Sequence, residues 1–280
     1  MQNDFMIECG DGKLIAATHF GREGKPTVII SAATGAQRSY YGRFAQSLVE
    51  QGFQVVTFDY RGIGDSTTKM NDPSASMTNW GELDLTAVIN WVAKNGNNPQ
   101  IFLVGHSVGG QIFPLARNKS LVRAAYFIAS QTASRYYWTG PQKLSVMLLW
   151  NLILPTTTTL TGKLPNWAYG GKYDLPKGVA IEWATWGRHK NGVLQDDNNR
   201  LRAFKEVNIP LRFISIADDK LLAPKDAVEQ LYHQYGSLNK EHHHWYPSDF
   251  GKRKIGHFGF FRKENSEMWD DVHLWLKRYV

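Results

Sequence analysis

Residues 101–110, Ile-Phe-Leu-Val-Gly-His-Ser-Val-Gly-Gly, join a short apolar run to a glycine-rich turn. The run 101–104 is typical of a buried strand, and the pattern Gly105-x-Ser107-x-Gly109 follows it directly. A serine on such a tight strand-to-helix turn has a strained backbone, so its hydroxyl projects clear of the sheet, and glycines on both sides avoid clashes. The following helix directs its free N–H groups at the same point. This stretch therefore predicts a nucleophilic serine, Ser107, at the end of a parallel strand.

Strand-like and helix-like segments alternate on both sides of this turn. Predicted strands lie at 5–9, 14–20, 27–32, 54–58, 101–104, 124–129, 210–217 and 243–246, and predicted helices at 40–51, 85–92, 224–235 and 268–280. Such alternation predicts an α/β fold with a mostly parallel central sheet and helices on both faces. The alternation stops between 131 and 200, where Trp, Tyr, Thr and Pro are frequent. We predict a core formed by 1–130 and 201–280, and an inserted helical cap at 131–200 over the carboxyl edge of the sheet.

The composition excludes several classes of protein. The chain has 280 residues, a net charge of +7 and one cysteine, so it cannot form an internal disulfide. Its charges form no long basic block, which argues against a nucleic-acid partner. The most hydrophobic run, 144–154, is too short to span a bilayer. Two interpretations of it remain, a cap edge that contacts lipid and a buried cap helix, and we prefer the buried helix. The first residues do not resemble a signal peptide, so we expect a cytoplasmic protein.

A serine hydroxyl needs a base to take its proton, and the base needs a carboxylate to orient it. On this kind of fold the acid and then the histidine follow the serine along the chain. Asp218 and Asp219 come directly after the predicted strand 210–217, and Asp219 is the preferred acid, with Asp218 as the alternative. His257, between glycines in Gly-His-Phe-Gly, is the predicted base. The consecutive histidines 242–244 point to alternate faces of a strand and do not predict a metal site.

An acyl-transfer site also needs two N–H donors for the oxyanion that develops during the reaction. One predicted donor is the backbone N–H of Val108, the residue after the nucleophile. The other should come from the small-residue loop after the third strand, 31–36, with Thr34 preferred and Ala33 or Gly35 as alternatives. No cofactor and no metal are needed for this chemistry.

Together these residues resemble the α/β-hydrolase superfamily, and more narrowly the bacterial predicted hydrolases of the serine aminopeptidase S33 and monoglyceride-lipase-like branch. The segments that carry the resemblance are Ala32-Ala-Thr-Gly35, Phe58-Asp-Tyr-Arg-Gly-Ile-Gly-Asp-Ser66, Gly105-His-Ser-Val-Gly-Gly110, Leu175-Pro-Lys-Gly-Val179 and Gly256-His-Phe-Gly-Phe-Phe-Arg262. The resemblance implies an α/β-hydrolase fold with a helical cap. Many relatives carry His-Gly where this chain has Ala32-Ala33. In the second segment we expect Arg61 to lock its loop by pairing with Asp59 and Asp65.

The leading functional hypothesis is a serine esterase that acts on a small-molecule ester through an acyl-enzyme. The aromatic insertion favours an apolar acyl or aromatic substrate of small to medium size, and the candidate pocket residues are Trp138, Trp150, Trp167, Trp183 and Trp186. An amidase or aminopeptidase with the same triad is an alternative, in which Glu182 or Asp174 would bind the amine. A ligand-binding protein without catalysis is a third reading. The sequence leaves the oligomeric state open.

Overall fold

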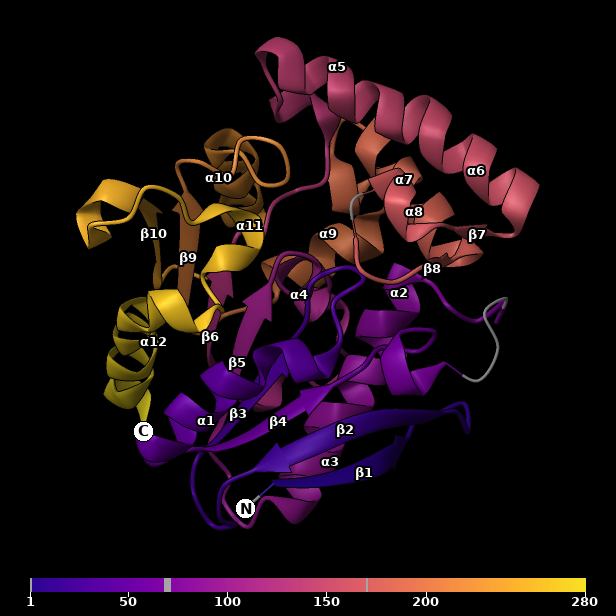
Figure 1. Cartoon of the computed structure of the whole chain (residues 1–280). Helices are drawn as coiled ribbons and strands as arrows, with labels where there is room; N and C mark the ends of the chain where they lie inside the picture. Colours follow the sequence, from indigo (N-terminus) through magenta and orange to yellow (C-terminus); the bar gives the residue numbers. More distant parts are fainter. Residues whose placement is uncertain (1, 68–71, 170) are drawn as a thin grey trace.

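A computed structural model describes residues 2–67, 72–169 and 171–280. Its centre is a sheet of eight strands in the order β1-β2-β4-β3-β5-β6-β9-β10 (Figure 1). Strands β1 and β2 form an antiparallel hairpin, and β2 is also antiparallel to β4. Every other pair of neighbouring strands in this sheet is parallel. The strands span Gln2–Glu8 (β1), Leu14–Phe20 (β2), Thr27–Ser31 (β3), Gln54–Phe58 (β4), Ile101–His106 (β5), Val122–Ile128 (β6), Leu211–Ile216 (β9) and Lys240–Trp245 (β10). The α/β architecture with a mostly parallel sheet is confirmed.

Helices connect the parallel strands and bury their apolar sides against the sheet. Strands β3 and β4 are buried along their whole length, as continuous apolar runs in parallel sheets usually are. The helices of this part span Gly42–Glu50 (α1), Met77–Asn79 (α2), Thr86–Asn95 (α3), Val108–Ile112 (α4), Lys225–Gln234 (α10), Gly256–Gly259 (α11) and Trp269–Leu276 (α12). Helix α1 packs on β4 and α10 on β9.

The segment between β6 and β9 carries the helices that lie over the carboxyl ends of the strands (Figure 1). Its elements span Gly140–Leu148 (α5), Leu154–Thr161 (α6), Lys163–Leu164 (β7), Asn166–Tyr169 (α7), Leu175–Pro176 (β8), Lys177–Arg188 (α8) and Asn198–Lys205 (α9). We call residues 131–200 the cap. A π-helical turn, Leu149–Ile153, joins α5 to α6 in one continuous helix, so the cap helix expected at 144–154 is longer than the sequence pattern indicated.

The loop after β4 is held by buried ion pairs, but not by the pairs that the sequence suggested. Arg61 is buried and binds Asp84 at 2.7 Å and Asp11 at 2.7 Å. Asp59 and Asp65 instead bind Arg38, from the turn before α1. The expected partners of Arg61 were wrong because Asp84, in the helical segment before α3, lies nearer in space than its sequence separation indicates. Burial raises the pKa of Asp84 to about 6, and Arg61 opposes that rise.

Removal of the Arg61 side chain should therefore destabilise the fold strongly. Arg61→Ala leaves the fully buried Asp84 without its cation, which should lower the free energy of unfolding by about 3–5 kcal/mol. Urea unfolding followed by tryptophan fluorescence measures this change. Arg117→Ala is the matched control because it breaks an exposed pair with Glu82 and should cost less than about 1 kcal/mol. An unchanged unfolding midpoint for Arg61→Ala would contradict this account.

Candidate active site

Ser107 lies at the turn between β5 and α4, and its backbone is strained. Its φ of 53° is a left-handed conformation that residues with a side chain rarely adopt, and its ψ is −113°. The flanking glycines make the turn possible. A Cβ on Gly109 would lie 2.3 Å from the carbonyl oxygen of Ser31, and one on Gly105 would lie 2.8 Å from Phe127. The strict glycine requirement that the sequence predicted is thus explained by contact with β3 and β6.

Asp219 and His257 are brought together from β9 and α11. His257 Nδ1 lies 2.6 Å from Asp219 Oδ2, and both side chains are buried. The other oxygen of Asp219 accepts hydrogen bonds from the backbone N–H groups of Leu222 and Ala223, at 3.2 Å each. The carboxylate is therefore held on both sides, and it fixes the Nδ1 edge of the imidazole.

Asp218 has a different place. Its two oxygens accept hydrogen bonds from the backbone N–H groups of Ile255 and Gly256, each at 2.9 Å. These residues immediately precede His257, and Gly256 has a φ of 63°. Asp218 thus anchors the loop that carries the histidine, whereas Asp219 contacts the imidazole itself. The two adjacent acids therefore both hold His257, one through its side chain and the other through the backbone before it.

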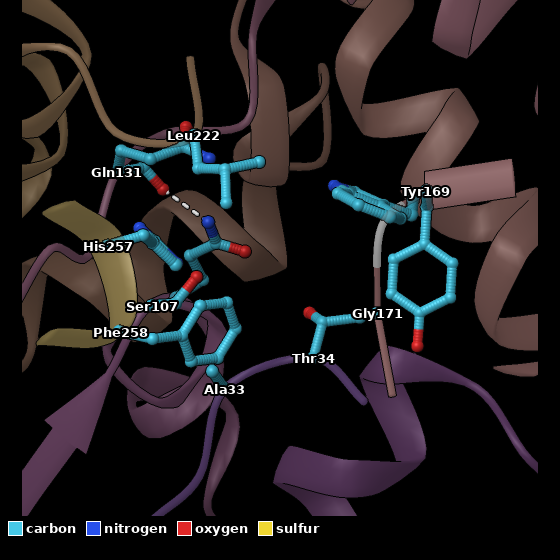
Figure 2. Close-up of a pocket in the computed structure, with 11 residues that line it drawn as sticks. Ala33, Thr34, Ser107, Gln131, Tyr169, Gly171, Leu222, His257 and Phe258 are labelled. Atoms are coloured by element: carbon cyan, nitrogen blue, oxygen red, sulfur yellow. Dashed lines mark hydrogen bonds between the residues drawn. The ribbon is translucent and has the colours of Figure 1, made fainter. Parts of the chain in front are cut away.

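Ser107 and His257 line the same cavity, which lies between the sheet edge and the cap (Figure 2). The cavity has a volume of about 50 Å³. Its described lining contains no carboxylate, and the lining residues are Ala33, Thr34, Ser107, Gln111, Gln131, Tyr169, Gly171, Trp183, Leu222, His257 and Phe258. Gln111 is hydrogen-bonded to the backbone of Gln131, with 2.6 Å between its Nε2 and the carbonyl oxygen.

Of the five tryptophans considered for the pocket, one lines it. Trp183 faces the cavity, whereas Trp138, Trp150 and Trp186 are buried in the packing around the cap. Trp167 is 73% exposed. The polar lining residues Gln111 and Gln131 were not predicted, because a glutamine carries no sequence signal that separates a pocket wall from ordinary packing.

The loop after β3 contributes Ala33 and Thr34 to the cavity wall. The N–H of Ala33 is already used, because it donates to the hydroxyl of Tyr41 at 2.9 Å. The N–H groups of Thr34 and Val108 meet no acceptor within residues 2–67, 72–169 and 171–280. These two amides are therefore free to bind a ligand oxygen, whereas the alternative Ala33 is not. Gly35 packs closely under Tyr169, since a Cβ there would lie 2.2 Å from the tyrosine oxygen.

His106 lies beside the nucleophile but does not face the cavity. Its Nε2 lies 3.0 Å from the carbonyl oxygen of His257, and its Nδ1 lies 2.9 Å from the hydroxyl of Tyr41. Because a carbonyl only accepts, Nε2 must carry the proton, and Tyr41 then donates to Nδ1. Complete burial lowers the pKa of His106 well below its ordinary value, so the ring is neutral. A chain of hydrogen bonds therefore runs from Ala33 through Tyr41 and His106 to His257.

Sequence comparison finds a short match to a protein of unknown role. An uncharacterised 31.7 kDa protein from the traX-finO intergenic region of Escherichia coli is 37% identical over 93 residues. That match covers 32% of this chain and 30% of the relative, so the chain aligns with less than a third of that protein's length.

Solved structures with a similar fold match over nearly the whole chain. DcsB, in complex with its substrate analogue, is 16% identical with a TM-score of 0.71, and the match covers all of both chains. The esterase EaEST from Exiguobacterium antarcticum is 17% identical with a TM-score of 0.65, over 97% of this chain and 98% of that one. At such identities the likeness shows the fold alone.

A family profile matches residues 22–248, from the β2–β3 turn past the last strand of the sheet. The profile describes the serine aminopeptidase S33 family, whose members are α/β-hydrolases. The matched range includes the elbow at Ser107 and both acids after β9. The chain therefore belongs to the serine aminopeptidase S33 family of α/β-hydrolases.

Proposed function

We propose that this protein is a serine esterase in which Ser107, His257 and Asp219 form the catalytic triad. One observation carries the proposal: Asp219 holds Nδ1 of His257, which leaves Nε2 of the imidazole for the cavity that Ser107 also lines. A carboxylate bound at Nδ1 fixes the tautomer in which Nε2 accepts a proton. These residues are sufficient for acyl transfer without a cofactor or metal.

The reaction would proceed in two steps. Ser107 Oγ attacks the ester carbonyl while His257 Nε2 takes its proton, and the tetrahedral intermediate then expels the alcohol, which receives that proton. Water attacks the acyl-enzyme by the same route and releases the carboxylic acid and free Ser107. The free amides of Val108 and Thr34 would hold the oxyanion in both steps, and Val108 is also the first residue of α4, whose positive end faces the site.

The shape of the cavity favours a short acyl group. About 50 Å³ accommodates only a few water-sized groups, and Leu222, Trp183 and Phe258 form apolar walls. A wider hollow of about 380 Å³ adjoins the cavity, because Thr34, Gly171 and Phe258 line both. We assign the acyl group to the inner cavity and the alcohol to the outer hollow.

Ester cleavage is favoured over removal of an N-terminal amino acid because the described lining of the cavity holds no carboxylate for the substrate's ammonium group. Glu182 is bound by Arg200 at 3.2 Å and by the backbone N–H of Thr78 at 2.9 Å. Asp174 is bound by Lys163 at 2.5 Å. Both acids that the sequence offered for amine recognition thus have partners within the fold.

Matched substrates test this choice. We expect kcat/KM for p-nitrophenyl acetate and butyrate to exceed that for alanine p-nitroanilide by at least about 100-fold, since the site lacks a group that would recognise the amine. We also expect kcat/KM to fall as the acyl chain lengthens from butyrate to decanoate. Ser107→Ala serves as the blank for both substrates. Equal or faster cleavage of the anilide would refute the esterase proposal and favour aminopeptidase activity.

A further inference from the structure

The longest helix of the cap is apolar on the outside as well as on the inside. Helices α5 and α6 and the π-helical turn between them run without a break from Gly140 to Thr161, at the outer edge of the cap and far from both termini (Figure 1). By length and composition alone, this 22-residue helix is long and apolar enough to cross a membrane, yet only 22% of its apolar window is buried. The prediction of a buried helix at 144–154 is therefore wrong for the outer face of the helix.

The two faces of this helix are distinct rows spaced four residues apart. Val146, Trp150, Leu154 and Thr158 are buried, and the helix packs this row against α8. The opposite row is exposed to between 45% and 80%, and its members are Leu144, Leu148, Leu152 and Leu160. A helix that is hydrophobic all round is normally enclosed by protein or by lipid. Here only one side is enclosed by the part of the chain that the structure describes.

The sequence that contains this helix carries charges of one sign. From Leu85 to Tyr173 the sequence contains no Asp or Glu, whereas the cap part of this stretch contains Arg135, Lys143, Lys163 and Lys172. Lys143 lies in α5 next to the exposed leucine at 144. Lys163 is paired with Asp174, whereas helix 140–161 itself carries Lys143 and no carboxylate. An exposed apolar row on such a helix is complementary to an anionic lipid surface. A second copy of the same face would instead bring like charges together.

We propose that helix 140–161, through the exposed row headed by Leu144, Leu148 and Leu152, docks the protein on the surface of a membrane that contains anionic phospholipid. The helix lies in the plane of the interface, with its leucines among the acyl chains and Lys143 at the headgroups. It does not span the bilayer, because its buried row is needed to pack the cap. This inference does not depend on the proposed chemistry of Ser107.

Vesicle co-sedimentation tests the proposal with the full chain. We expect the protein to bind vesicles of phosphatidylglycerol and phosphatidylcholine at least about ten times more strongly than vesicles of phosphatidylcholine alone, with a loss of binding at high salt. The triple variant Leu144→Gln, Leu148→Gln, Leu152→Gln should lose binding by about 100-fold, because three apolar side chains no longer leave water. Ser107→Ala should bind as the wild type does, which separates docking from catalysis.

Two exposed leucines elsewhere provide controls. Leu274, 61% exposed in α12, and Leu238, 96% exposed before β10, lie outside the cap, so Leu274→Gln and Leu238→Gln should bind vesicles normally. The triple variant should keep its melting temperature and its far-ultraviolet circular dichroism, which shows that it folds. Absence of wild-type binding to anionic vesicles, or equal binding by the triple variant, overturns the proposal. A dimer that the triple variant abolishes, without vesicle binding, assigns the face to a second copy and overturns it too.

Discussion

Ser107→Ala should lower kcat for p-nitrophenyl butyrate by about 10⁴-fold or more, and it should abolish covalent labelling by a fluorophosphonate. The reason is that no other hydroxyl in the cavity lies on the strained turn after β5, within the described residues. Intact-mass spectrometry after fluorophosphonate treatment and steady-state kinetics measure the two effects. A second nucleophile that still carries the adduct in Ser107→Ala would refute the assignment.

Ser107→Gly separates the chemistry from the backbone strain. Glycine adopts a φ of 53° at little cost, whereas alanine there keeps the strain. Both variants should be inactive, but Ser107→Gly should unfold with a free energy about 1 kcal/mol higher than Ser107→Ala, as measured by urea denaturation. Equal stability of the two would show that the turn is not strained in the folded protein.

The second large effect concerns the two adjacent acids. Asp219→Asn should lower kcat by about 10³–10⁴-fold with the fold intact, because the amide favours the wrong tautomer of His257. Asp218→Asn should lower kcat by only about tenfold, since it loses one of two hydrogen bonds to the loop before His257. Kinetics of the two purified variants, checked by circular dichroism, decide between them. The reverse order of effects would make Asp218 the triad acid.

The features that the sequence predicted are those encoded over a few neighbouring residues. The turn at Ser107 requires an apolar strand before it and glycines on both sides, and each of these requirements is local. The strands of the parallel sheet are short apolar runs for the same reason. The choice between Asp218 and Asp219 is different, because it depends on which side chain reaches a histidine 38 residues later.

Features decided by tertiary contacts were missed or predicted wrongly. Arg61 pairs with Asp84 rather than Asp59 because the helical segment before α3 packs against its loop, and local sequence does not contain that contact. The cap helix was expected to be buried, since composition shows that a helix is apolar but not which neighbours cover it. Gln111 and Gln131 enter the cavity wall only through the packing of α4 against the start of the cap.

The hydrogen-bond chain through His106 couples the loop after β3 to the loop that carries His257. The loop after β3, which contains Ala33 and the free amide of Thr34, is tied through Tyr41 and His106 to the carbonyl of His257. Each N–H or O–H group in this chain has one acceptor, so no hydrogen bond can change its direction without leaving a buried polar group unpaired. A ligand that displaces the loop after β3 is therefore expected to displace the backbone at His257 as well. Replacement of either Tyr41 or His106 alone leaves a buried polar group of the other without its partner.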